Sequence, residues 1–101
     1  MIVITGDVEL RPEHRAAGIA LCREHSERSR KEPGCISHDC TIDLENDNLV
    51  RFIERWEDMA AVQVHFQVPE AQGLVASLSD FKAAPFVIRL FDANPVDEIS
   101  A

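Results

Sequence analysis

The sequence predicts an α+β fold in which a four-stranded antiparallel sheet carries helices on one face, the ferredoxin-like arrangement. One observation behind this prediction is the order of hydrophobic patterns, which read strand, helix, strand, strand, helices, strand along the chain. Another is that only the two middle strands lie close enough in sequence for a tight hairpin, so the other strands are joined by right-handed crossovers. The 101 residues fit one domain, expected over residues 1–93, with residues 94–101 as an acidic C-terminal tail.

The first strand and helix predict a covered cavity. Apolar and polar residues alternate over residues 2–10, as in a half-buried strand, and Pro12 then opens a helix that ends near Arg30. The inner stripe of this helix carries small and polar side chains, namely Gly18, Cys22, His25 and Ser29. Such a stripe favours a helix that covers a cavity, with His25 facing inward; a rotated helix with an exposed His25 is the alternative.

The middle hairpin holds an unusual carboxylate. Strands are expected over residues 35–44 and 49–56, joined by the turn-forming residues 45–48. Glu54 shares its face of the second strand with apolar side chains, namely Val50, Phe52 and Trp56. Because burying an isolated carboxylate is unfavourable, Glu54 either finds a partner, such as a histidine or an arginine, or has its pKa raised.

The register of this hairpin decides whether His38 joins Glu54. A four-residue loop that pairs Leu44 with Leu49 would put the two side chains on opposite faces of the sheet. A connection of odd length would put them on the same face. The apolar patterns of the two strands favour the odd connection.

The C-terminal half predicts two helices and a last strand. An acidic residue at position 57 or 58 caps a helix over about residues 59–66, and His65 lies on the apolar side of this helix. A second helix runs over about residues 69–79, and residues 86–93 form a strand that is apolar on both faces.

The face of the sheet that the helices leave open is too apolar for solvent. Under the odd register it carries Val3, Leu49, Ile53, Val87 and Phe91. A second copy of the chain is the simplest way to shield this face from solvent, so we expect a homodimer with the two sheets packed together.

Composition excludes several classes of partner. The net charge of −8 and the absence of a Lys/Arg run argue against binding to nucleic acid or to an anionic membrane surface. No apolar run reaches the length of a membrane span, and the first residues do not resemble a signal peptide. The three cysteines show no disulfide or Cys-x-x-Cys pattern, so we expect free thiols and a cytoplasmic location.

Three motifs carry a resemblance to a known family. They are the Glu32-Pro33-Gly34-Cys35 turn, the Glu54-x-Trp56 strand, and His65 on the helix that follows. With these motifs the sequence resembles the antibiotic biosynthesis monooxygenase family of small, quinol-monooxygenase-like proteins. The resemblance spans about residues 2–93 and implies a dimeric α+β barrel.

The resemblance also implies a chemistry. A deprotonated hydroquinone or polyphenol can give an electron to dioxygen without flavin or metal, so the protein needs a dry cavity, a base and hydrogen bonds to the anion. We expect His65 to be the base or hydrogen-bond donor, because imidazole titrates near neutral pH, and Glu54 to orient a histidine. A purely structural role for either residue is the alternative. Candidate substrate-binding residues are Trp56, His38, His25 and Phe52.

Two departures from the family pattern leave the substrate open. Relatives commonly have Tyr where this chain has His38, and many have a second His after Ser/Thr-Pro, where this chain reads Val68-Pro69-Glu70. No His-x-x-x-His or Glu-x-x-His spacing occurs, so we expect no metal site. Residues 66–101 contain no histidine, which argues against haem, and we expect no cofactor.

The sequence therefore predicts a cofactor-independent monooxygenase that oxidises a quinol or polyphenol with dioxygen. One alternative is an isomerase or lyase acting on a small dicarbonyl or phosphorylated metabolite, for which Arg51, Arg55 or Arg89 would have to face the pocket. The other is a dimeric ligand-binding module without catalysis.

Overall fold

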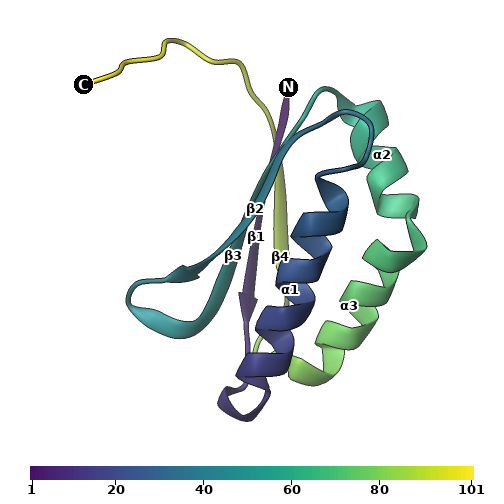
Figure 1. Cartoon of the computed structure of the whole chain (residues 1–101), viewed down its shortest axis with the longest axis vertical. Helices are drawn as coiled ribbons and strands as arrows, with labels where there is room; N and C mark the ends of the chain where they lie inside the picture. Colours follow the sequence, from purple (N-terminus) through teal and green to yellow (C-terminus); the bar gives the residue numbers. More distant parts are fainter.

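A computed structural model describes residues 1–101 and shows one sheet with all helices packed against the same side (Figure 1). The elements are β1 (Ile2–Glu9), the 3-10 helix η1 (Pro12–His14), α1 (Arg15–Ser29), β2 (Cys35–Asp43), β3 (Asn46–Trp56), α2 (Met59–Gln67), α3 (Pro69–Phe81) and β4 (Val87–Asp92). The four strands are antiparallel in the order β2-β3-β1-β4. The predicted ferredoxin-like α+β fold is confirmed.

The β2–β3 hairpin has the odd register. His38 lies directly opposite Glu54, so both side chains point to the helix side of the sheet. The turn, however, occupies Leu44 and Glu45 and not residues 45–48, because Asn46 already pairs with Asp43 across a bulge. The turn-forming residues at positions 46 to 48 are drawn into β3 by the sheet, which outweighs their local preference for a turn.

The core lies between the sheet and the helices in two clusters of apolar side chains. The larger cluster joins β1, β3, α1 and α3 through Val8, Leu10, Cys22, Val50, Phe52, Leu74 and Leu78. The smaller one joins β1, β3 and α2 through Ile2, Ile4, Trp56 and Val62. Between the two clusters the interior is polar, and this is where the histidines collect.

The turn that enters β2 depends on one glycine. Gly34 has φ of +82°, and a β-carbon at this position would lie 2.5 Å from the β-carbon of Ala61. The loop therefore packs directly on the first turn of α2. That turn is capped by Asp58, whose carboxylate accepts a hydrogen bond of 2.9 Å from the backbone of Ala61.

The open face of the sheet carries apolar side chains and a ladder of ion pairs. Ile53 is 51% exposed and Phe91 49% exposed, although both lie within strands. Arg51 spans neighbouring strands, with distances of 2.8 Å to Asp7 and 3.3 Å to Asp43.

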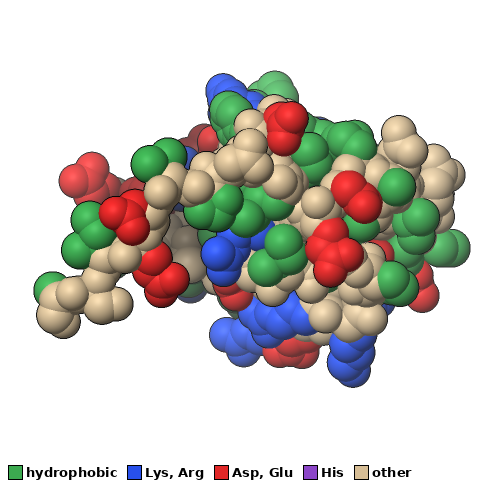
Figure 2. Space-filling model, turned by 90° about the horizontal axis from the view of Figure 1, so that it is seen from above, with side chains coloured by type: hydrophobic (Ala, Val, Ile, Leu, Met, Phe, Trp, Pro, Cys, Tyr) green, Lys and Arg blue, Asp and Glu red, His purple; other side chains and the backbone are tan.

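Beyond β4, residues 93–101 have no regular secondary structure and extend away from the body of the domain (Figures 1 and 2). None of the helices has the length and the apolar content needed to span a bilayer.

Candidate active site

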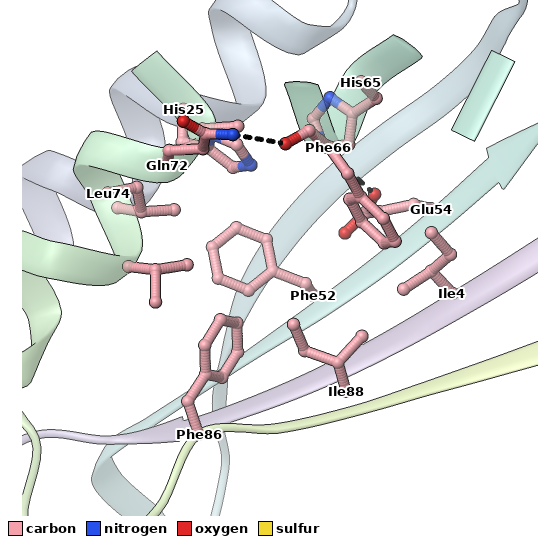
Figure 3. A pocket seen from close by; sticks show the side chains of 12 residues that line it. Ile4, His25, Phe52, Glu54, His65, Phe66, Gln72, Leu74, Phe86 and Ile88 are labelled. Carbon is pink, nitrogen blue, oxygen red and sulfur yellow. Dashed lines mark hydrogen bonds and ion pairs between the residues drawn. The ribbon is translucent and has the colours of Figure 1, made fainter. Parts of the chain in front are cut away.

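A cavity of about 240 Å³ opens between the sheet and the helices (Figure 3). Most of its wall is apolar, and four polar side chains interrupt it: His25, Glu54, His65 and Gln72. The apolar wall consists of Ile4, Phe52, Phe66, Ala71, Leu74, Val75, Phe86 and Ile88. A mostly apolar cavity with a few convergent polar groups is the usual form of a small-molecule site.

His65 is held from outside the cavity by Glu32. Its Nδ1 lies 3.0 and 3.1 Å from the two carboxylate oxygens of Glu32, which stands in the turn before β2. An ionised carboxylate only accepts hydrogen bonds, so Nδ1 of His65 donates and carries a proton. The other ring nitrogen, Nε2, faces Glu54 at 3.8 Å.

Glu54 is buried and has partners of its own. The indole N–H of Trp56 donates to Oε1 of Glu54 at 3.0 Å. Nε2 of His38 lies 3.2 Å from the same oxygen, but the angle does not suit a hydrogen bond, and this nitrogen has no other partner. The carboxylate is therefore surrounded by three ring systems, those of His38, Trp56 and His65.

His38 is fully buried behind the cavity wall. Its Nδ1 shares a hydrogen bond of 2.9 Å with the hydroxyl of Ser26 on α1. The ring also stands edge-on to Phe52, with centroids 5.8 Å apart. His38 thus braces α1 against the strand pair and points its free nitrogen at Glu54.

His25 lines the cavity from α1 and is only 6% exposed. The guanidinium of Arg28, one turn further along the helix, donates to its Nδ1 at 2.7 Å. Burial, followed by the neighbouring positive charges that protonated His38 and His65 would carry and by that of Arg28, lowers the pKa of His25 from 6.5 to about 3. His25 is therefore neutral at physiological pH.

The three buried histidines come together from α1, β2 and α2. A ring nitrogen of each lies within 4.8 Å of one from the other two. Their spacing in the sequence does not reveal this cluster, because three separate elements bring them together. Arg28 already occupies Nδ1 of His25, and its positive charge disfavours a second cation at the same place. The absence of a metal requirement stays a prediction.

The structure divides the predicted site residues into two groups. His25, Phe52, Glu54 and His65 line the cavity, whereas His38 and Trp56 lie behind its wall and contact the lining residues, among them Glu54 and His65. Sequence reasoning assigned no site role to Glu32, Ser26, Arg28 and Gln72. Two of these residues could have been found from the sequence. Arg28 lies one helical turn from His25 and can therefore contact it, and Glu32 belongs to the Glu-Pro-Gly-Cys motif.

The fold and the cavity between sheet and helices define a small α+β domain of the kind that binds or converts small molecules. Comparison with known sequences identifies its family. Residues 1–77 match the family model of the antibiotic biosynthesis monooxygenases, and the chain belongs to this family. The uncharacterised Synechocystis protein sll1783 is 37% identical over 90 residues, which make up 89% of this chain and 61% of that protein. The chain thus spans less than two thirds of this relative.

Solved structures agree with the family assignment. The crystal structure of an antibiotic biosynthesis monooxygenase that is 28% identical matches with a TM-score of 0.86 over 94% of this chain and 100% of that chain. A Deinococcus radiodurans structure that is 21% identical matches over 100% of both chains with a TM-score of 0.94, which shows the same fold. Membership of the family supports a monooxygenase-type function.

Proposed function

We propose that the protein is a cofactor-independent monooxygenase that oxidises a quinol or a related single-ring polyphenol with dioxygen. The observation that carries this proposal is the largely apolar cavity of about 240 Å³ with His25, Glu54 and His65 in its wall. An apolar cavity of about 150 Å³ already holds benzene, so a hydroxylated ring has room here. The family membership supports the same class of reaction.

In the proposed reaction His65 is the base. Its Nδ1 proton is held by Glu32, which leaves the lone pair of Nε2 to accept the proton of a substrate hydroxyl. The carboxylate of Glu54, 3.8 Å from Nε2, stabilises the imidazolium that forms. Trp56 keeps this carboxylate in place through its indole hydrogen bond.

The remaining steps belong to the substrate and dioxygen. The anion gives one electron to dioxygen, the resulting substrate radical and superoxide combine, and loss of water leaves a hydroxylated quinone. One atom of dioxygen enters the product and the other leaves as water, so a quinol needs no external reductant. The apolar wall, including Phe52, favours this sequence because it keeps bulk water from the reactive species.

An isomerase acting on an anionic metabolite is less well supported. An arginine in the cavity would be needed to bind the negative charge of such a substrate, but Arg51, Arg55 and Arg89 lie on the open face of the sheet. There Arg51 and Arg89 contact Asp7, and Arg55 donates to Ser37. A module that only binds a ligand remains the alternative if no turnover is found.

We further propose that the working unit is a homodimer joined through the open sheet faces. Val3, Ile53 and Phe91 are neighbours across β1, β3 and β4 on this face, and each is at least partly exposed in the single chain. A second copy would bury these side chains. The three free cysteines, which suit a reducing compartment, support a cytoplasmic location.

Oxygen uptake tests the proposed reaction. Protein stripped of metals with a chelator is mixed with a panel of reduced quinols and polyphenols, and uptake is corrected for autoxidation. His65→Ala removes the base, and His14→Ala is the matched control, since His14 stacks on Phe81 away from the cavity. With isotopically labelled dioxygen, mass spectrometry shows whether one labelled atom enters the product.

We expect uptake with the wild type and the His14 variant, about a hundredfold loss in the His65 variant, and one labelled oxygen atom in the product. Equal rates for the wild type and His65→Ala would remove His65 from the mechanism. Uptake without label in the product would indicate an oxidase. Activity that disappears on chelation and returns with a metal would overturn the cofactor-independent reaction.

A further inference from the structure

Two histidines in the cavity wall are held from outside by groups of opposite charge. Nδ1 of His65 contacts the carboxylate of Glu32 at 3.0 Å, and Nδ1 of His25 contacts the guanidinium of Arg28 at 2.7 Å. An ionised carboxylate can only accept a hydrogen bond and a guanidinium can only donate one. Nδ1 therefore carries a proton in His65 and a lone pair in His25.

These two bonds also decide what each ring presents to the cavity. A neutral imidazole has one proton, so the proton of His25 lies on Nε2, whereas Nε2 of neutral His65 is a bare acceptor. The environment keeps His25 neutral, because the ring is buried and has Arg28 and two further imidazoles, those of His38 and His65, around it. The structure gives Nε2 of His25 no hydrogen-bond partner within the chain, so its N–H is free for a ligand.

We propose that Arg28 and Glu32 are positioning residues that fix His25 and His65 as opposite tautomers, so that the cavity binds an ionisable phenolic hydroxyl between one donor and one acceptor. The ring centroids of His25 and His65 lie 5.3 Å apart and a nitrogen of each ring lies within 4.8 Å of one in the other, so a single oxygen atom can form hydrogen bonds of ordinary length to both rings. The hydroxyl donates to Nε2 of His65 and accepts from Nε2–H of His25.

The arrangement favours the deprotonated ligand over the neutral one. When the hydroxyl proton passes to Nε2 of His65, the phenolate oxygen keeps the hydrogen bond from His25 and gains a second one from the new imidazolium. A methyl ether has no proton to give and leaves Nε2 of His65 unpaired. This catalytic consequence rests on the proposed function, but the tautomers themselves do not.

Arg28 is also oriented by the fold. It lies one turn after His25 on α1. Its Nε is buried without a partner, and its Nη2 makes the hydrogen bond to His25. Lysine at this position would still donate to Nδ1. Methionine, of similar length, would not, and would leave His25 free to move its proton to Nδ1.

Nuclear magnetic resonance of the full chain labelled with nitrogen-15 in histidine tests the assignment directly. At pH 7 we expect a proton on Nε2 of His25 and on Nδ1 of His65. Arg28→Met should shift His25 toward the Nδ1 tautomer and leave His65 unchanged, and Arg28→Lys should keep the wild-type pattern. Arg23→Met, at an exposed position of the same helix, is the control and should change neither ring.

Binding and turnover supply the second readout. Phenol should perturb the resonances of both rings, and anisole, its methyl ether, should bind at least tenfold more weakly. With an active quinol, Arg28→Met should lower kcat about a hundredfold, with a smaller change in KM, and Arg28→Lys should restore most of it.

The outcomes separate this proposal from the proposed function. If His25 and His65 carry the same tautomer in the wild type, or if Arg28→Met leaves the His25 tautomer unchanged, the proposal is wrong whatever the activity. Opposite tautomers and phenol binding in a protein that oxidises no quinol would support the proposal and overturn the oxygenase reaction.

Discussion

Lowering the pH from 7 to 5 should destabilise the protein, and His25 should account for a large part of the loss. The pKa of His25 is about 3 in the folded chain and about 6.5 in the unfolded chain. Between these values the unfolded state takes up a proton at position 25 and the folded state does not. The stabilisation that neutral His25 contributes to the folded state is therefore fully present above pH 6.5 and is lost progressively as the pH drops toward 3.

The size of the effect follows from the two pKa values. One proton bound only by the unfolded state changes the free energy of unfolding by at most about 1.4 kcal/mol per pH unit. Because the uptake begins near pH 6.5, His25 should remove about 2 kcal/mol between pH 7 and pH 5. His25→Gln, which has no titrating group at this position, should lose about 2 kcal/mol less than the wild type over the same interval.

Urea unfolding followed by the fluorescence of Trp56, the only tryptophan, measures this difference. The curves are recorded at pH 5, 6 and 7 at one protein concentration, and His14→Gln, which removes a histidine outside the cavity, serves as the control. The same loss in wild type and His25→Gln would refute the reasoning. So would a titration of His25 near pH 6.5 in the folded protein by nuclear magnetic resonance.

The fold offers three further tests. Gly34→Ala should destabilise the protein by about 1 to 3 kcal/mol in urea unfolding, because Gly34 combines a positive φ with a close neighbour, whereas Gly73→Ala, in open space within α3, should stabilise by up to about 1 kcal/mol. Ile53→Lys on the open sheet face should shift sedimentation from dimer to monomer, while Ile99→Lys in the tail should not; an unchanged dimer would relocate the interface. Cys22, fully buried and with its pKa raised to about 12 by burial and then by Cys40, should resist alkylation at pH 8 until urea unfolds the chain; modification of the native protein, seen by mass spectrometry, would contradict its placement.

Local patterns were sufficient to predict the elements and their faces. The alternation of residues 2–10 and 49–56 fixed which side chains of β1 and β3 point to the helices, and the structure agrees. The polar stripe on α1 correctly placed His25 inward. The turn of the hairpin was predicted too late in the chain, because pairing with the neighbouring strands decides the state of Asn46 more strongly than its turn preference.

The partners of the site residues were less accessible to sequence reasoning. Glu54 was recognised as a carboxylate that needs a partner, but the sequence left open whether a histidine or an arginine would supply it, and it did not indicate the hydrogen bond from the indole of Trp56. Glu32 precedes His65 by 33 positions, and their contact exists only because the loop at Gly34 packs on α2. Contacts of this length depend on how helices are set against the sheet, which no local period encodes.

The sequence by itself thus determined the ferredoxin-like fold, the apolar open face and the faces on which Glu54 and His65 lie, because each follows from a two-residue or helical repeat. It left two orientations open for His25, and the structure shows the inward one. Only the tertiary structure decided that three histidines from three elements meet, that two of them flank the carboxylate of Glu54, and that His38 and Trp56 stand behind the cavity wall. It also decided which charged group touches each ring, Arg28 for His25 and Glu32 for His65. The physical reason is that a hydrogen bond sets a tautomer through distance and direction, and both are fixed only when the helices have packed on the sheet.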